Sequence, residues 1–344
     1  MIHFDVTKAA GARHRSGLTR VSARLLDHLG AAARPIRWDP RRRGFADGVS
    51  PEPADWFLTA ELFSEEERPG FSAFLASRSC RTAAIFHDAI PLRLPHVTWP
   101  QSVARHPAYL KLLARCDRVW AVSAASRDEL LGIWRWQELP RVPPVEVLPL
   151  GSDVGSLRRT TVPSPHRPAR LLCLGIIEPR KNQGFLAEVC AALWDEGVDF
   201  ELHVIGRVNP HFGPPLLARL QEVRRRHPTH LFLHGAADDA TVAALLATAR
   251  ATVFPSLAEG CGLPLLESLW QGVPCVGSDL PALRENAAAG GCVLVAPDDA
   301  AAWRDAIRRV VTDDPFQAAL VRSAATRPLP TWQDAAQVLL AGLH

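Results

Sequence analysis

The sequence predicts an α/β protein made of two doubly wound, Rossmann-like domains. In both halves, short apolar runs alternate with longer segments that have apolar residues at helical spacing. Between the halves, residues 154–167 are rich in Pro, Ser and Arg and have no apolar periodicity, which is typical of a linker. The chain of 344 residues, 47% hydrophobic and 22% charged, is long enough for two soluble domains. We expect these domains at residues 1–153 and 168–330.

The first half is predicted to form a parallel sheet with helices on both faces. Strands are expected at 2–6, 55–59, 82–86, 119–122 and 145–148, and helices at 18–29, 71–77, 101–114 and 127–134. The loop after the first strand contains Gly11 and Gly17, is flanked by Arg15 and Arg20, and ends at Ser16, a candidate N-cap. Ligands of such sheets bind at the carboxyl ends of the strands.

The second half repeats the alternation more regularly. Strands are expected at 170–174, 200–205, 231–233, 252–254, 275–277 and 292–295, with amphipathic helices between most of them. A further helical segment, residues 331–343, follows Pro328 and Pro330. This half is therefore predicted to be doubly wound as well.

A glycine turn after the strand at 252–254 is the best candidate for a phosphate site. The strand should end at Pro255, and Gly260 and Gly262 permit unusual backbone angles and close approach of a ligand. Pro264 suits the first turn of a helix that we expect from Leu263 to Gln271. The unpaired N–H groups and partial positive charge at that helix start favour a phosphate group.

Two carboxylates bracket this turn. Glu267 shares a helix face with Leu263 and Trp270, where an unpaired carboxylate is costly, so it needs hydrogen-bond donors such as the hydroxyls of a ribose. Glu259 lies in the loop beyond the strand and could accept from a sugar that lies past the phosphates. In the alternative interpretation, Glu267 pairs with a basic side chain and Glu259 is solvated.

Two cations follow the first strand of the second half. Arg180 and Lys181 precede a helix from Gln183, at the strand end that faces the same cleft as the helix from Leu263. Two cations in this place can neutralise a diphosphate. The alternative is a helix-entry turn with solvated charges.

Several stretches resemble retaining GT-B glycosyltransferases of the family 4 type, as found among bacterial mannosyl- and rhamnosyltransferases. Residues Glu259-Gly-Cys-Gly-Leu-Pro-Leu-Leu-Glu267 match the donor-site signature E-G-F-G-L-P-x-x-E, with Cys261 in place of the usual aromatic residue. Further matches are His-Asp-x-x-Pro at 87–91, V-S-x-x-S at 122–126 and G-x-x-x-x-R-K-N at 175–182, and a weaker one, because it is short, is V-x-G at 204–206. Glu285-Asn286-Ala departs from the family's Glu-Val-Ala-Gly.

The resemblance implies a GT-B fold, in which the two domains face each other across a cleft and the closing segment 331–344 returns to the first domain. It implies that His87 reaches the donor sugar across the cleft and that Ser126 caps a helix. The residues expected to act in catalysis are His87, Arg180, Lys181 and Glu259. Those expected to bind the donor are Gly17, Gly206, Arg207, Gly260, Cys261, Gly262, Leu263, Pro264 and Glu267.

The implied reaction is a retaining transfer of a hexose from a nucleotide sugar to a saccharide or lipid-linked saccharide acceptor, in bacterial polysaccharide or glycolipid assembly. Resemblance favours a GDP-sugar of the mannose type, with UDP- and dTDP-sugars left open. We expect no metal and no other cofactor, since no Asp-x-Asp occurs in the chain and Arg180 and Lys181 can stabilise the leaving group. The alternatives are a GT-B nucleotide-sugar epimerase, a catalytically silent sugar-nucleotide-binding subunit, and a glycosidase that uses Glu259 and Glu267.

Composition bears on location and partners. A net charge of +3 is too small to indicate nucleic acid binding. The seven cysteines include no C-x-x-C pair, and no leader or membrane-spanning run is found in the sequence, so we expect a cytoplasmic protein with reduced thiols. Residues 109–115 and 134–136 mix basic with aromatic side chains, which suggests peripheral contact with the inner face of an anionic membrane. The alternative is a solvated amphipathic helix.

Overall fold

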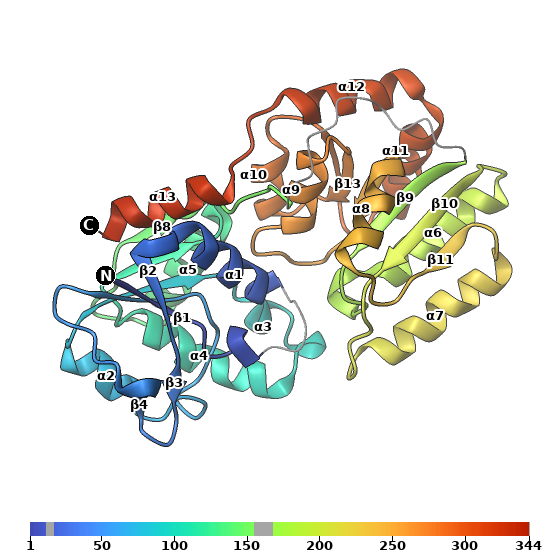
Figure 1. Ribbon diagram of the computed structural model, residues 1–344. Coiled ribbons are helices and arrows are strands. Elements are labelled where there is room, and N and C mark those ends of the chain that lie inside the picture. Colours follow the sequence, from blue (N-terminus) through green and yellow to red (C-terminus); the bar gives the residue numbers. More distant parts are fainter. Residues whose placement is uncertain (12–16, 155–167, 344) are drawn as a thin grey trace. The chain divides into compact units, whose positions relative to one another are not determined.

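The computed structural model describes residues 1–11, 17–154 and 168–343, and its chain divides into two compact units (Figure 1). Unit 1 comprises Met1–Gly151 and Pro330–His344, and unit 2 comprises Ser152–Leu329. The predicted flanking Arg15, the predicted N-cap Ser16 and nearly all of the predicted linker lie outside the described residues.

Unit 1 contains a six-stranded parallel sheet in the order β2-β1-β5-β6-β7-β8, as expected for a doubly wound domain. The strands are β1 (Ile2–Asp5), β2 (Ala33–Ile36), β5 (Trp56–Thr59), β6 (Arg81–Phe86), β7 (Arg118–Ala121) and β8 (Val145–Val147). β2 was not predicted from the sequence, because it is an edge strand that contains Pro35 and is only partly buried. A short hairpin of β3 (Trp38–Asp39) and β4 (Gly44–Phe45) was not predicted either.

The helices of unit 1 are α1 (Gly17–Leu29), α2 (Phe71–Ser77), α3 (Ile90–Arg93), α4 (Pro100–Leu113), α5 (Ala124–Trp136) and the closing α13 (Trp332–Leu343). Most of them lie within a residue or so of their predicted positions; α3 was not predicted, and α5 begins three residues earlier than predicted. α13 packs against α1 (Figure 1). Gly151 lies so close to the closing helix that a β-carbon there would be 2.3 Å from the Trp332 nitrogen.

The predicted N-cap at Ser126 is wrong. α5 begins at Ala124, and the Ser123 side chain accepts a hydrogen bond from the Ser126 backbone N–H at 3.0 Å. Ser126 lies inside the first turn, where its hydroxyl donates to the His87 carbonyl at 2.8 Å. Ser126 therefore links α5 to the end of β6 instead of starting the helix.

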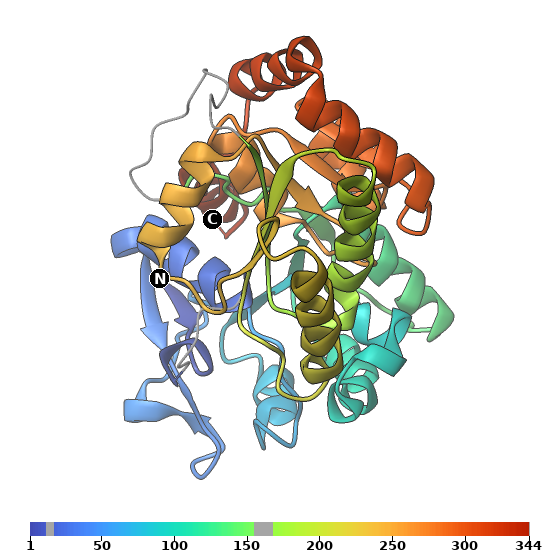
Figure 2. The same cartoon turned by 90° about the vertical axis from the view of Figure 1, so that its right-hand side faces the viewer.

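Unit 2 contains a second six-stranded parallel sheet, in the order β11-β10-β9-β12-β13-β14. Its strands are β9 (Ala169–Leu174), β10 (Phe200–Ile205), β11 (Leu231–Leu233), β12 (Ala251–Phe254), β13 (Cys275–Ser278) and β14 (Cys292–Val295). Its helices are α6 (Gln183–Asp195), α7 (Gly213–Arg226), α8 (Asp239–Thr248), α9 (Leu263–Trp270), α10 (Pro281–Ala287), α11 (Ala300–Thr312) and α12 (Asp314–Thr326). α6 packs between α7 and α11, and Figure 2 shows α6 and α7 side by side.

The strand orders place a ligand site in each sheet. In a doubly wound sheet, the loops at the carboxyl ends of two neighbouring strands diverge where the strand order reverses, and ligands bind there. In unit 1 this switch point lies between β1 and β5, and in unit 2 it lies between β9 and β12. Ligand-binding residues are therefore expected in four loops, those that begin after Asp5, Thr59, Leu174 and Phe254.

Candidate functional site

The switch point of unit 2 gathers charged side chains from two loops. Arg180 and Lys181 lie in a 3₁₀ turn, Pro179–Lys181, in the loop after β9. Glu259 follows β12. The structure thus brings together three residues that the sequence placed at separate strand ends.

These side chains form a compact ion cluster. The Lys181 Nζ donates to Glu259 Oε1 at 2.6 Å, and the Arg180 Nη1 donates to the same oxygen at 3.2 Å and to the Ala258 carbonyl at 3.0 Å. Only 11% of the Lys181 side chain and 9% of the Glu259 side chain is exposed. Glu259 is therefore not a solvated loop residue. Its carboxylate already accepts hydrogen bonds from both cations, so a sugar hydroxyl that bonds to it would share it with them.

Two members of this cluster were not singled out from the sequence. Glu178 accepts two hydrogen bonds from the Arg180 guanidinium, at 2.8 and 3.1 Å, and one from the Asn209 side-chain amide at 3.0 Å. Glu178 lies just beyond β9, next to the turn that holds the two cations, and this position in the sequence could have indicated a role in the site. Glu178 fixes the guanidinium in one orientation, as bonds to a charged partner do.

Burial and ion pairing set the protonation of the cluster. Burial alone would raise the pKa of Glu259, but the adjacent Lys181 and Arg180 lower it, so the carboxylate is ionised at neutral pH. Burial lowers the pKa of Lys181, an effect that Glu259 opposes. An incoming anion would compete with Glu259 for the two cations.

The glycine turn before α9 has the expected backbone. Gly262 is the N-cap of α9 and has φ +82°, and a β-carbon there would lie 2.3 Å from a Leu283 methyl group. Leu263 and Pro264 form the first turn; Pro264 has no N–H, and the Leu265 N–H donates to the Gly262 carbonyl at 3.0 Å. The amide of Asn286 donates to the Cys261 carbonyl at 2.5 Å, so Asn286, a departure from the family pattern, supports this turn.

Glu267 lies in the second turn of α9 and is half-buried, as is Trp270 on the same face, while Leu263 is buried. Cys261 is half-buried, and burial raises the pKa of its thiol to about 12, so the thiol is neutral. Gly260, between Glu259 and Cys261, is buried.

Gly206 allows two loops to meet closely at the ends of β9 and β10. A β-carbon at Gly206 would lie 1.8 Å from the Gly175 carbonyl oxygen. Next to it, the Arg207 side chain is exposed while its carbonyl accepts from the Ile177 N–H at 2.9 Å. Gly206 is therefore needed for backbone packing under the charged cluster.

The remaining predicted residues, His87 and Gly17, belong to unit 1. The His87 Nε2 lies 2.9 Å from the Ala60 carbonyl oxygen, so this nitrogen carries the proton and donates. Burial lowers the pKa of His87, which keeps the imidazole neutral at pH 7. Gly17 is the exposed first residue of α1, and a β-carbon there would have no described atom within 4 Å.

Comparison with known families gives one matching domain. Residues 168–313 match the family described as Glycosyl transferases group 1. These residues cover most of unit 2, including the ion cluster and the turn into α9.

The relatives in sequence are mannosyltransferases. The serotype-specific mannosyltransferase WbdA of Escherichia coli is 29% identical over 254 residues, which is 67% of this chain and 29% of WbdA. The GDP-mannose-dependent alpha-(1-6)-phosphatidylinositol dimannoside mannosyltransferase of Mycobacterium tuberculosis is 32% identical over 206 residues, or 57% of this chain and 51% of that protein. The chain thus spans about half or less of the length of these relatives.

Solved structures share the fold over nearly the whole chain. HepE of Anabaena, crystallised with UDP and glucose, superposes with a TM-score of 0.73 at 12% identity and covers 99% of this chain and 98% of its own. WaaG, a glycosyltransferase involved in lipopolysaccharide biosynthesis, superposes with a TM-score of 0.65 at 15% identity, covering 98% and 99%. The domain match and the sequence relatives thus show similarity to glycosyltransferases, and the solved structures show that the chain has a GT-B fold.

Proposed function

We propose that this protein is a glycosyltransferase that moves a hexose from a nucleotide sugar to a saccharide acceptor. The observation that carries the proposal is the cluster of Arg180, Lys181 and Glu259 at the switch point of unit 2. Glu259 also begins the turn into α9, so the cations and the N-terminus of α9 belong to one sheet edge. Such an edge suits a diphosphate.

The cluster supplies what the departing nucleotide needs. When the bond between the anomeric carbon and the phosphate breaks, negative charge grows on the diphosphate and positive charge on the sugar. Arg180 and Lys181 are preorganised donors for the negative charge, since Glu178 and Glu259 hold them in place. Glu259, ionised at neutral pH, can stabilise the positive charge on the sugar.

In this proposal the donor is a GDP-sugar of the mannose type, and the reaction retains the anomeric configuration and needs no metal. The names of the relatives support the mannose type, and one names GDP-mannose as its donor. The two cations support metal independence, because they can carry out the charge neutralisation that a divalent ion performs in other transferases. Binding of GDP, UDP and dTDP by calorimetry decides the nucleotide.

The proposed acceptor is a saccharide or lipid-linked saccharide of a cell-surface polysaccharide or glycolipid, and the proposed location is the cytoplasm, at the inner face of the membrane. This part of the proposal is supported by the names of two relatives, one a phosphatidylinositol dimannoside mannosyltransferase and the other an O-antigen chain mannosyltransferase. No helix within residues 1–11, 17–154 and 168–343 is long and apolar enough to cross a membrane.

The decisive experiment incubates the full chain with a panel of GDP-, UDP- and dTDP-hexoses, with and without bacterial glycolipid acceptors, in the presence of EDTA. The proposal predicts nucleotide release that rises when an acceptor is added. An epimerase would convert the donor sugar without an acceptor, and a silent binding subunit would bind nucleotide without releasing product. Either result would contradict the proposal.

A further inference from the structure

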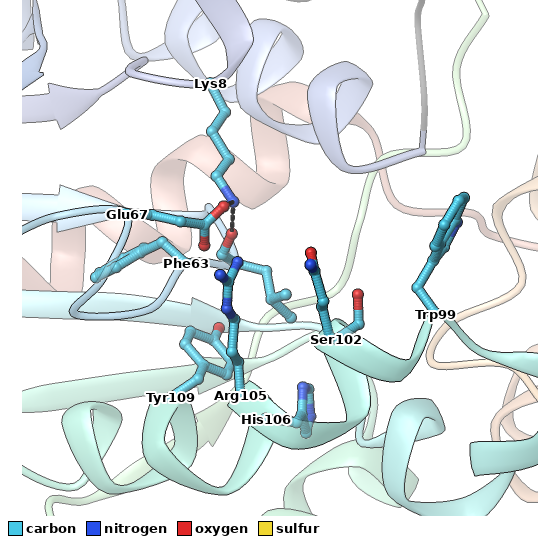
Figure 3. Close-up of a pocket in the computed structure, with 10 residues that line it drawn as sticks. Lys8, Phe63, Glu67, Trp99, Ser102, Arg105, His106 and Tyr109 are labelled. Atoms are coloured by element: carbon cyan, nitrogen blue, oxygen red, sulfur yellow. Dashed lines mark hydrogen bonds and ion pairs between the residues drawn. The ribbon is translucent and has the colours of Figure 1, made fainter.

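A pocket at the switch point of unit 1 has no role so far. Its lining comes from the loops after β1 and β5 and from one face of α4 (Figure 3). Its volume is about 210 Å³, below the size usual for drug-sized ligands. The pocket lies where a doubly wound sheet binds ligands, and its size suits one small ring.

The α4 wall of the pocket presents polar groups at helical spacing. Ser102, Arg105, His106 and Tyr109 recur at intervals of three and four residues, which places them on one face of the helix. Tyr109 is 1% exposed and its hydroxyl has no hydrogen-bond partner among the described residues. His106 is also 1% exposed, and its ring lies beside the Asp88 backbone. Buried polar groups are almost always hydrogen-bonded, so the Tyr109 hydroxyl, which lines the pocket, is available to a polar ligand.

Both buried groups are uncharged. Burial lowers the pKa of His106, so its imidazole is neutral at pH 7 and offers one donor and one acceptor. Burial raises the pKa of the Tyr109 phenol far above its usual value, so the O–H group remains intact. Each group can both give and receive a hydrogen bond, as a sugar hydroxyl does.

The rim of the pocket mixes charges of both signs. The Lys8 Nζ lies 2.9 Å from Glu67 Oε1 (Figure 3). Arg105 pairs with Glu66 at 2.6 Å. Burial would raise the pKa of Glu67, but Lys8 lowers it, so Glu67 is ionised and would repel a phosphate. Neighbouring hydroxyls of a sugar, in contrast, can donate to Glu67 and accept from Lys8.

An aromatic surface completes the pocket. Trp99 lines it at the start of α4 and is 45% exposed, at the end of the wall away from Tyr109 (Figure 3). An exposed indole offers an apolar face to the C–H side of a pyranose ring. Hydroxyl-binding groups at one end and an indole at the other end match the two kinds of surface on a sugar.

The loops of the pocket are fixed by a buried network. Both carboxylate oxygens of Glu61 accept from the Lys8 N–H, at 2.7 and 2.9 Å, and one also accepts from the Ala9 N–H at 2.9 Å. Arg68, 1% exposed, pairs with Glu61 and with Asp5 at the end of β1. The loop after β1 is thereby held to the loop after β5 before any ligand binds.

We infer that this pocket binds one pyranose ring of the saccharide acceptor, with hydroxyls at Tyr109, His106, Lys8 and Glu67 and an apolar ring face at Trp99. The inference rests on the proposed function for its link to the acceptor. The chemistry of the pocket alone supports the sugar.

The test measures binding of methyl α-mannopyranoside and methyl α-glucopyranoside to the full chain by saturation-transfer NMR, with GDP present. Tyr109→Phe, which removes only a hydroxyl, and Trp99→Ala should each weaken binding tenfold or more. Ser77→Ala removes an exposed hydroxyl at the end of α2 and should leave binding unchanged.

Three outcomes would overturn the inference: no glycoside binds the wild type, both pocket variants bind as the wild type does, or inorganic phosphate displaces the glycoside. Calorimetry with nucleotide serves as a fold control, because unit 2 should bind it equally in all variants. Glycoside binding that depends on Tyr109 without any sugar transfer would refute only the proposed function. If both variants transfer sugar with an unchanged KM for the acceptor, only the assignment of this pocket to the acceptor is refuted.

Discussion

At the residue scale, the central feature is that Glu259 has two possible sets of partners. In the structure it accepts from Lys181 and Arg180, the same cations that a diphosphate would need. A carboxylate that competes with the ligand weakens ground-state binding of the anion but is available when charge develops on the sugar. Glu267 lies on α9 and is not bonded to these two cations.

We predict that the two glutamates can be separated by substitution. Glu267→Ala should weaken binding of free nucleotide and of intact donor alike, by about 1.5–3 kcal/mol for a charged hydrogen bond. Glu259→Ala should bind free nucleotide at least as tightly as the wild type, because it releases two cations, yet turn over much more slowly. Calorimetry and initial rates measure both effects.

Glu188→Ala is the matched control for these variants, since Glu188 pairs with exposed arginines of α7. An equal loss of nucleotide affinity in the Glu267 and Glu259 variants would show that the two roles are assigned wrongly.

We predict a pH-dependent contribution of His87 to stability. The folded-state pKa of His87 is lowered, so between that value and about 6.5 the unfolded chain binds more protons than the folded one. The contribution is therefore present above pH 6.5 and is lost as pH falls below it. His87→Gln keeps an N–H donor for the Ala60 carbonyl but does not titrate. The melting temperature of the wild type should fall relative to this variant between pH 7.5 and 5.5, and a constant difference would refute the prediction.

Part of the site could be predicted from the sequence, since Arg180, Lys181 and Glu259 follow strands that end at the same sheet edge. Their mutual ion pairing could not be predicted, because it joins residues 78 and 79 positions apart and depends on the strand order. The pocket of unit 1 was missed for the same reason. Its α4 residues have a recognisable helical spacing, but their partners come from loops that only the β1–β5 pairing brings near.

At the element scale, the sheet positions the site through close contact between loops. Gly206→Ala would place a methyl group 1.8 Å from a backbone carbonyl that cannot move without distorting β9. We expect a loss of stability of about 1–3 kcal/mol or more, seen as a lower melting temperature. Gly132→Ala, inside α5 with no atom within 4 Å, should instead stabilise the chain by roughly 0.5–1 kcal/mol. Equal melting temperatures for the two variants would contradict this explanation.

The central strands and long helices could be predicted because they are apolar or strongly periodic, as in β6 and α1. The edge strand β2 could not, because Ala33-Arg-Pro-Ile36 has neither alternation nor full burial. The start of α5 was misplaced because Ser123 and Ser126 are both good N-cap residues, and only the hydrogen bonds distinguish them.

At the scale of the whole molecule, the surface expected to touch a membrane is smaller than the sequence suggested. Tyr109 and Trp134 are each 1% exposed and belong to the core of unit 1. Trp136 is 80% exposed at the end of α5, beside the exposed Arg135. Any aromatic contact with lipid from this part of α5 should therefore be made by Trp136.

We predict that the protein sediments with vesicles containing anionic lipid at low salt. Trp136→Ala and Arg135→Ala should each reduce the bound fraction, the second by about fivefold in affinity, since a basic residue near such a surface is worth about 1 kcal/mol. Ser77→Ala should have no effect. Equal sedimentation of all variants, or no binding at low salt, would refute the membrane contact.

The measurement that tests the central claim most directly is calorimetry of GDP and UDP with wild type and Lys181→Ala in EDTA. Lys181 is part of the proposed diphosphate site, and a charged hydrogen bond is worth about 1.5–3 kcal/mol. We predict that the wild type binds one of the nucleotides without metal and that Lys181→Ala weakens it by about tenfold or more, while Lys111→Ala, on the exposed side of α4, does not. Unchanged affinity in Lys181→Ala would contradict the assignment of this cluster as the donor site.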